Sequence, residues 1–181
     1  VRQRLGIAEE DAVDTAAAKL LAGVEEHISD PAERPYVGAR LGRLLGLPFP
    51  GDTGAEIDRG ELFAGWRLWF ERLAAENPVA LLVEDLQYAD AGLLDFLDHL
   101  VDWARDVPLF VLAFTRPELD TARPGWGQGR NRTVLGLDPL DSASMDALIE
   151  ALVPGIPAAA VATNAEQAQG IPLFAVETIR S

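Results

Sequence analysis

The sequence predicts an α/β fold in which a parallel sheet follows a long helical segment, and three observations carry this prediction. Two unbroken apolar runs, Val79–Val83 and Leu109–Phe114, have the composition of strands that are buried on both faces of a parallel sheet. Between them, Asp90–Ala104 carries leucines at helical spacing, as expected of the crossover that joins two parallel strands. Residues 1–77 show only helical patterns.

The helical segment begins with two predicted helices. Ala8–Ile28 is rich in Ala, Leu and Glu, which favour helix. Asp30–Glu33 supplies a capping residue, a proline and an acid, so a second helix is expected to begin there. This helix is predicted to run towards Leu45 and to stop at Gly46.

A third helix is predicted to begin at the capping residue Asp58 and to bury one apolar stripe. Trp66 lies on this stripe and is predicted to be a core residue, although a tryptophan can also mark a binding surface. Trp69 lies away from the centre of the stripe and is expected to be partly exposed. The stripe comprises Leu62, Phe63, Trp66, Phe70 and Leu73.

The rest of the chain continues the alternation. His99 is expected to be a surface residue of the crossover helix, because it has no obvious partner. Thr133–Leu137 is predicted to be a third, shorter strand. Asp141 or Ser142 is expected to cap a helix that ends at Leu152, and helices are predicted at Ala158–Gln169 and Leu173–Ile179. The expected parts are a helical segment at 1–77, an α/β core at 78–140 and C-terminal helices at 141–181.

Composition limits the classes of function. The chain has 181 residues and a formal net charge of −14, which disfavours a nucleic-acid-binding face because such faces are basic. It has no cysteine, which excludes disulfides, thiolate metal sites and cysteine nucleophiles. No apolar run reaches the length of a membrane span and no signal peptide opens the chain, so a cytoplasmic location without membrane contact is expected.

Two acids follow the first predicted strand directly. Glu84 and Asp85 would lie at the carboxyl end of the sheet, where ligands bind in open parallel sheets. One acid of such a pair can hold Mg²⁺ while the other orients a water molecule at a phosphate, which is the pattern of a Walker B strand. The alternative interpretation is a strand that simply ends in solvated acids.

Four stretches together resemble the STAND-type signalling ATPases, a branch of the AAA-like P-loop NTPases. The relatives in question accompany class III adenylate cyclase domains or belong to LuxR-type regulators. Leu81–Asp90 looks like their Walker B segment, Leu112–Leu119 like their sensor 1 strand end, and Arg123–Asn131 like a loop of the cyclase-associated subgroup. Gly170–Phe174 is similar to the Gly-x-Pro element at which their helical lid begins. The resemblance covers nearly the whole chain.

The resemblance implies roles for individual residues. Glu84 would hold Mg²⁺, and Asp85 would polarise the water that attacks ATP. Arg116 would sense the γ-phosphate, although an arginine at that place can also simply pair with a nearby acid. Gly170 and Pro172 would lie near the adenine, although Gly and Pro can also merely separate two helices.

One essential part of the family pattern has no counterpart in these residues. The family holds the ATP phosphates with a Walker A loop, Gly-x-x-x-x-Gly-Lys-Ser/Thr, and the only lysine, Lys19, follows three alanines in a predicted helix. We therefore expect the chain to begin after the Walker A portion of a larger module, and to bind Mg²⁺ and ATP weakly or not at all by itself. The expected partners are that missing portion and a cyclase or DNA-binding effector domain, and self-association is also expected.

Three functions remain open from the sequence. The first is the C-terminal portion of a STAND-type regulatory ATPase module, without autonomous ATPase activity. The second is a non-enzymatic interaction module that holds partners through its helical regions. The third is a Mg²⁺-dependent hydrolase that uses Glu84, Asp85 and Asp90, and it is the weakest because the turn Gln87–Ala89 offers no further ligand.

Overall fold

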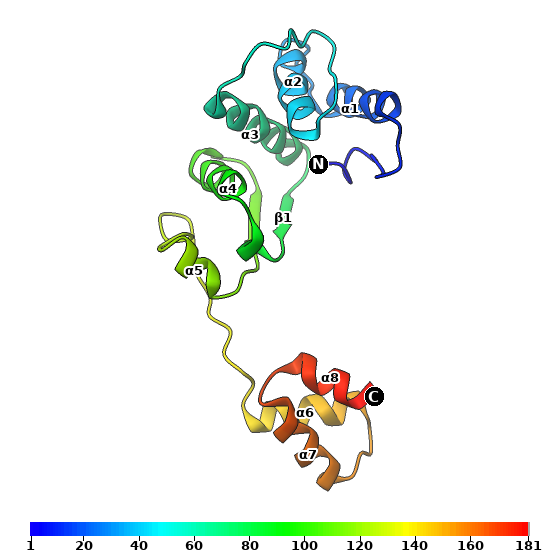
Figure 1. Ribbon diagram of the computed structural model, residues 1–181, viewed down its shortest axis with the longest axis vertical. Helices are drawn as coiled ribbons and strands as arrows, with labels where there is room; N and C mark the ends of the chain where they lie inside the picture. Colours follow the sequence, from blue (N-terminus) through cyan, green and yellow to red (C-terminus); the bar gives the residue numbers. More distant parts are fainter. Residues whose placement is uncertain (181) are drawn as a thin grey trace. The chain divides into compact units, whose positions relative to one another are not determined.

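The computed structural model describes residues 1–180 and is a mixed α/β structure, mostly helical, with a small parallel sheet. The chain divides into two compact units, Val1–Thr133 and Val134–Ser181 (Figure 1). The first unit contains a helical bundle and the sheet, and the second contains helices only. The α/β class predicted from the sequence is therefore confirmed, and each unit is described by itself below.

The first unit begins with three packed helices, α1 (Val13–His27), α2 (Arg34–Leu45) and α3 (Arg59–Glu76). Their apolar faces enclose the largest buried cluster of the chain, because each helix presents a stripe at helical spacing. Gly46 ends α2 in the left-handed conformation, with φ 68°, as its glycine predicts. The side chain of Asp58 caps α3 by accepting hydrogen bonds from the amides of Gly60 and Glu61. Residues of the cluster that are completely buried include Leu20, Val24, Ile28, Val37, Leu41 and Trp69.

Both of the first two helices begin later than predicted, and local side-chain bonds explain the delay. The Asp11 carboxylate accepts from the Ala8 amide at 2.8 Å and so holds a turn before α1. The Asp30 carboxylate accepts from the Ala32 amide at 2.9 Å, which makes Asp30 the start of a turn rather than the cap of α2. Asp residues favour such turns as strongly as they favour helix caps.

The prediction of a partly exposed Trp69 in α3 was wrong, whereas Trp66 packs against two core clusters as predicted. Trp69 is completely buried and Trp66 is half-buried, with its indole N–H donating to the Arg40 carbonyl at 2.8 Å. A single stripe was assumed, but α3 is packed on two sides. Trp69 faces the α1–α2 side, whereas Trp66 and Phe63 also pack against Phe96 of the next helix.

The sheet consists of β1 (Val79–Val83) and β2 (Leu109–Ala113), which pair in parallel as predicted. The register places Val79 opposite Leu109 and Val83 opposite Ala113. The helix between them, α4 (Ala91–Trp103), is capped by Asp90, whose carboxylate accepts from the Leu93 amide at 2.8 Å. A short 3-10 turn, η1 (Leu86–Tyr88), and a short helix, α5 (Glu118–Ala122), follow β1 and β2 respectively.

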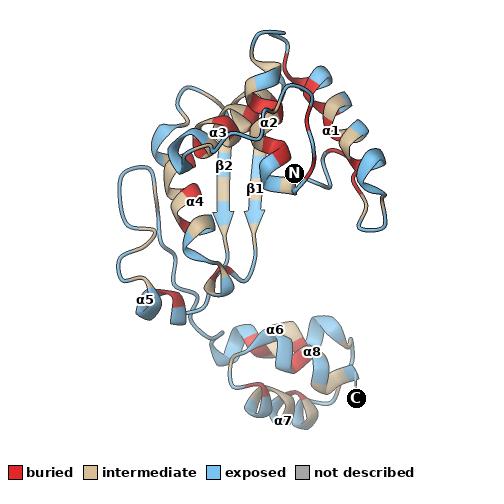
Figure 2. Ribbon diagram, turned by 45° about the horizontal axis from the view of Figure 1, so that its top comes forward, coloured by how far each residue is buried: buried red, intermediate tan, exposed pale blue. Residues whose placement is uncertain are grey.

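The prediction that both strands are largely buried was wrong. Burial alternates along each strand, because Leu94, Leu97 and Leu100 of α4 pack against only one face of the sheet. On the other face Leu82 is 58% exposed and Phe110 is 62% exposed, and Figure 2 shows the alternating colours along the strands. An unbroken apolar run therefore overstates burial here, since it predicts cover on two faces and one is present.

His99 of α4 is half-buried, so the prediction of a surface position was wrong. Its ring lies 5.7 Å from the ring of Phe63 and 6.1 Å from that of Trp103, and its Nε2 is buried without a hydrogen-bond partner. Burial lowers the pKa of His99, and the positive charge of Arg67 on α3 lowers it further. The carboxylates of Asp102 and Glu71 act in the opposite direction.

The second unit consists of α6 (Ser142–Leu152), α7 (Ala158–Ala168) and α8 (Pro172–Arg180), close to the predicted helices. The cap of α6 is Asp141, whose carboxylate accepts from the Ser144 amide at 2.7 Å. A small core of Met145, Ile149, Val161, Ala168 and Ala175 holds the three helices together.

The predicted strand at Thr133–Leu137 is not present among the described residues. Its side chains are highly exposed, with Leu137 at 89%. A short strand forms only when it pairs with a neighbouring edge, and Thr133–Leu137 pairs with neither β1 nor β2. Local β propensity was therefore insufficient at this place.

A lowered pKa at His99 predicts a specific dependence of stability on pH. The unfolded chain takes up a proton at His99 near pH 6.5 whereas the folded chain resists it, so stability falls as the pH drops below that value. Urea midpoints at several pH values between 7.5 and 5 should fall more steeply for the native chain than for His99→Phe. Parallel midpoint curves for the two proteins would contradict this account.

Two features of the sheet predict self-association. One face exposes apolar side chains such as Phe110, and the open edge of β2 has no charge or proline to protect it. Sedimentation velocity should show mass increasing with concentration, and Phe110→Lys should reduce this increase. Val13→Lys is a matched control, since Val13 on α1 is 59% exposed. Equal behaviour of the two variants, or a native chain that stays monomeric at high concentration, would show that this face does not drive association.

Candidate functional site

The carboxyl end of the sheet is built by backbone hydrogen bonds that continue beyond the two strands. The Phe114 amide donates to the Val83 carbonyl at 2.8 Å, and the Leu86 amide donates to the Phe114 carbonyl at 3.0 Å. Asp85 lies between these contacts in the left-handed region, with φ 52° and ψ 38°. This conformation turns the chain sharply into η1 and is one that Asp tolerates better than most residues.

Gln87 joins the two segments that the sequence singled out. Its side-chain amide donates from Nε2 to Asp85 Oδ1 at 2.9 Å, and its Oε1 accepts from the Arg116 amide at 3.2 Å. Both donor and acceptor of the amide are therefore used in a consistent orientation. The structure thus brings the Asp85 carboxylate and the backbone of Arg116 together across one side chain.

Three charged side chains at this edge are free of ion pairs. Glu84, Asp85 and Arg116 are exposed, and none of them belongs to an ion pair among residues 1–180. The alternative in which Arg116 pairs with a nearby acid is therefore not seen. Carboxylates without an ion pair can bind a cation, and a guanidinium without one can bind an anion.

The edge offers a metal ion few protein ligands. Residues 1–180 contain no group of three or more His, Cys, Asp or Glu side chains that could hold a metal ion. Asp90, the third acid considered from the sequence, is engaged as the cap of α4. Glu84 and Asp85 alone suit Mg²⁺, which binds through one or two carboxylates when phosphates and water complete its shell. They do not suit a metal held by protein alone.

Gly170 and Pro172 have structural explanations in the second unit. Gly170 has φ 80°, its carbonyl accepts from the Leu140 amide at 2.8 Å, and a Cβ at this position would lie 2.6 Å from the Cβ of Pro139. Glycine is therefore required twice, by conformation and by the close approach of the chain. Pro172 is the first residue of α8, where a proline costs no hydrogen bond.

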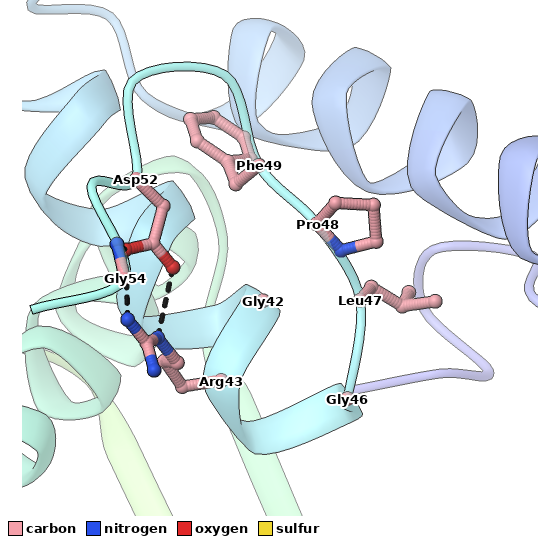
Figure 3. A pocket seen from close by; sticks show the side chains of 8 residues that line it. All are labelled: Gly42, Arg43, Gly46, Leu47, Pro48, Phe49, Asp52 and Gly54. Atoms are coloured by element: carbon pink, nitrogen blue, oxygen red, sulfur yellow. Dashed lines mark hydrogen bonds and ion pairs between the residues drawn. The ribbon is translucent and has the colours of Figure 1, made fainter.

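A separate hollow of about 340 Å³ lies between the C-terminal end of α2 and the loop that follows it (Figure 3). The Arg43 guanidinium spans this hollow and donates to both oxygens of Asp52, at 2.8 and 2.9 Å. It also donates to the Ala55 carbonyl at 3.1 Å. Because its charged group is already satisfied, the hollow is better explained as part of the loop's own structure. No residue predicted to be functional lines it.

The sequence did not identify Gln87 as the residue that joins the two segments. The only available signal was the position of Gln87 two residues after Asp85. Its contact with Arg116 depends on the distance between the ends of β1 and β2, which the sequence does not give. The sequence also did not predict that Arg123 and Arg132, at the ends of a glycine-rich loop, form ion pairs with α4. A spacing of i, i+3 and i+7 in Asp95, Asp98 and Asp102 was the signal for one acidic face on that helix.

Comparisons with known proteins identify no family for this chain. No protein-family model, curated protein or solved structure matches this chain. Among residues 1–180, no helix is both long enough and apolar enough to cross a membrane.

Removing the Gln87 side chain should loosen this edge locally. In Gln87→Ala, the Arg116 amide should exchange with solvent faster, because it loses its acceptor, while the free energy of unfolding should change by less than about 1.5 kcal/mol. Gln167→Ala on the exposed face of α7 is the matched control. Unchanged exchange at Arg116 in Gln87→Ala, measured by NMR, would mean that the bridge does not order this edge.

Proposed function

We propose that this chain is part of the ATP-binding module of a STAND-type regulatory ATPase in a signalling protein. In this proposal Glu84 holds Mg²⁺, Asp85 polarises the attacking water and Arg116 contacts the γ-phosphate. An attached cyclase or DNA-binding domain would be the effector that the module switches.

The observation that carries the proposal is the Asp85–Gln87–Arg116 connection at the carboxyl end of two parallel strands. Ligands of open parallel sheets bind at this end. A phosphoryl-transfer site needs an acid for Mg²⁺, a residue that orients water and a cation for the developing charge. The edge presents residue types for all three needs, and their charged groups are exposed.

The proposal also requires phosphate-binding groups that these residues do not supply. Lys19 of α1 is the only lysine, and its ammonium group donates to Asp11 at 2.6 Å and to the Gly6 carbonyl at 2.8 Å. It is thus engaged at the start of the helical bundle. We propose that a Gly- and Lys-containing loop outside these residues completes the site, and that the chain by itself binds Mg²⁺ and ATP weakly and does not turn ATP over.

A non-enzymatic interaction module is the second candidate, and exposed apolar side chains favour it. Ile171, Leu173 and Phe174 are all exposed at the start of α8. The uncovered face of the sheet is a further apolar surface in the first unit. Apolar surfaces of this kind often mark contacts with partner proteins. This candidate needs no nucleotide, which makes the two candidates separable.

The test begins with the coding sequence in frame before Val1 and with the complete polypeptide. A Gly-x-x-x-x-Gly-Lys-Ser/Thr there, together with a rise in melting temperature when Mg²⁺-ATP is added, is the expected result. Asp85→Asn should lower the ATPase rate by at least about a hundredfold while binding persists, because it removes the group that polarises water. The 181-residue chain alone should hydrolyse ATP at the background rate.

Asp106→Asn is the matched control for this experiment. Asp106 is also exposed and also lies in the left-handed region, with φ 56°, but it precedes β2 at the opposite end of the sheet. Its replacement should leave ATP turnover unchanged. A complete polypeptide that neither binds nor hydrolyses ATP would overturn the proposal and leave the interaction module.

A further inference from the structure

The outer face of α4 carries an acidic stripe that is neutralised by arginines from other elements. Asp95 pairs with Arg123 and, at 2.6 Å, with Arg59 of α3. Arg132 reaches Asp98 at 3.2 Å and Asp102 at 2.7 Å. The Arg123 guanidinium also holds the pKa of Asp95 below its usual value, so this acid stays ionised.

Arg123 and Arg132 are the two ends of one irregular segment, Arg123–Arg132, which we call the strap. All three of its glycines, Gly125, Gly127 and Gly129, and also Asn131 have positive φ. Residues with positive φ do not fit a helix or a strand, and a glycine-rich segment loses much conformational entropy when it becomes ordered. Its order on α4 must therefore come from the contacts at its ends and from the one large side chain in its middle.

That side chain is Trp126, which links the strap to the candidate site. Its indole packs on a cluster that contains Leu86, Leu94, Leu97 and Leu119, and its Nε1 donates to the Leu94 carbonyl at 3.4 Å. Leu86 is the first residue of η1 and stands between Asp85 and Gln87. Through Trp126 the strap therefore packs against η1, the turn that positions the Asp85–Gln87–Arg116 connection.

We propose that the strap opens from α4 and closes on it, and that its closure orders η1. In the closed state, Arg123 and Arg132 hold the two ends of the strap on α4 through their ion pairs. The inference rests on the proposed function only in assigning this regulation to a nucleotide site. Exposed and partly exposed ion pairs are individually weak and are screened by salt. The closed strap depends on such pairs and on one half-buried indole, so its closure should depend on ionic strength.

The experiment measures amide exchange by mass spectrometry in the double variant Arg123→Gln/Arg132→Gln, without nucleotide. We expect amides of the strap to exchange at least about tenfold faster than in the native chain, because the ion pairs at both ends of the strap are lost. Amides of Leu86–Tyr88 should exchange at least about threefold faster. In the native chain the same increase should appear as NaCl rises from about 0.05 M to about 0.5 M, and it should be absent from the variant.

Arg105→Gln/Arg130→Gln is the matched control, since it removes the same charge from two exposed arginines that form no ion pair among residues 1–180. It should behave as the native chain does. Faster exchange in the strap with no change at Leu86–Tyr88 would overturn the proposed regulation, and equal exchange in both double variants would overturn the strap itself. If the first double variant fails to fold, which faster exchange in α1 would reveal, the salt series on the native chain decides. Absence of ATP binding would bear only on the proposed function.

Discussion

The parallel pairing of β1 and β2 is the interaction on which the rest of the first unit depends. It brings Val83 beside Ala113, so the segments that leave the two strands start from the same edge. Two further backbone hydrogen bonds and the Gln87 bridge can then form between segments that are about thirty residues apart in sequence. A two-stranded sheet is marginal by itself, and here α4 covers one face while aromatic contacts between α3 and α4 fix that helix.

The elements that could be predicted from the sequence are those whose signals are local. Asp58, Asp90 and Asp141 cap helices as predicted, since a cap depends on three or four neighbouring residues. The pairing of two apolar runs across a helix also followed, because a crossover of this length favours parallel strands. The starts of α1 and α2 were missed because Asp11 and Asp30 form local turns instead of caps, and the other failures depend on packing partners far away in sequence. Trp69 is core because α1 and α2 lie on its side of α3, and Leu82 is exposed because no described helix covers it.

The same distinction applies to the candidate site. Glu84 and Asp85 could be named from their position after an apolar strand, because the end of a strand is a local feature, whereas Arg116 was named from the family resemblance. Gln87 could not, because its role depends on the Arg116 amide reaching it from β2. Gly170 was named for a ligand role, and its close contact with Pro139 and Leu140 gives it a structural role that spacing alone does not reveal. The arginines of the strap were visible as residues but not as partners of α4.

Electrostatics then sets what this edge can do. With a net charge of −14, the chain repels a polyphosphate in solution, so the nucleotide of the proposed function would have to arrive with a metal ion or meet local cations. Most arginines that surround the sheet are already engaged, since Arg59, Arg123 and Arg132 neutralise the acidic stripe of α4. Arg116, which follows β2 at the same edge, forms no ion pair among residues 1–180. Under our two proposals, the arginines of the strap neutralise acids of α4 while Trp126 packs against Leu86 of η1, and the carboxylates of Glu84 and Asp85, which form no ion pair, remain available to a metal ion.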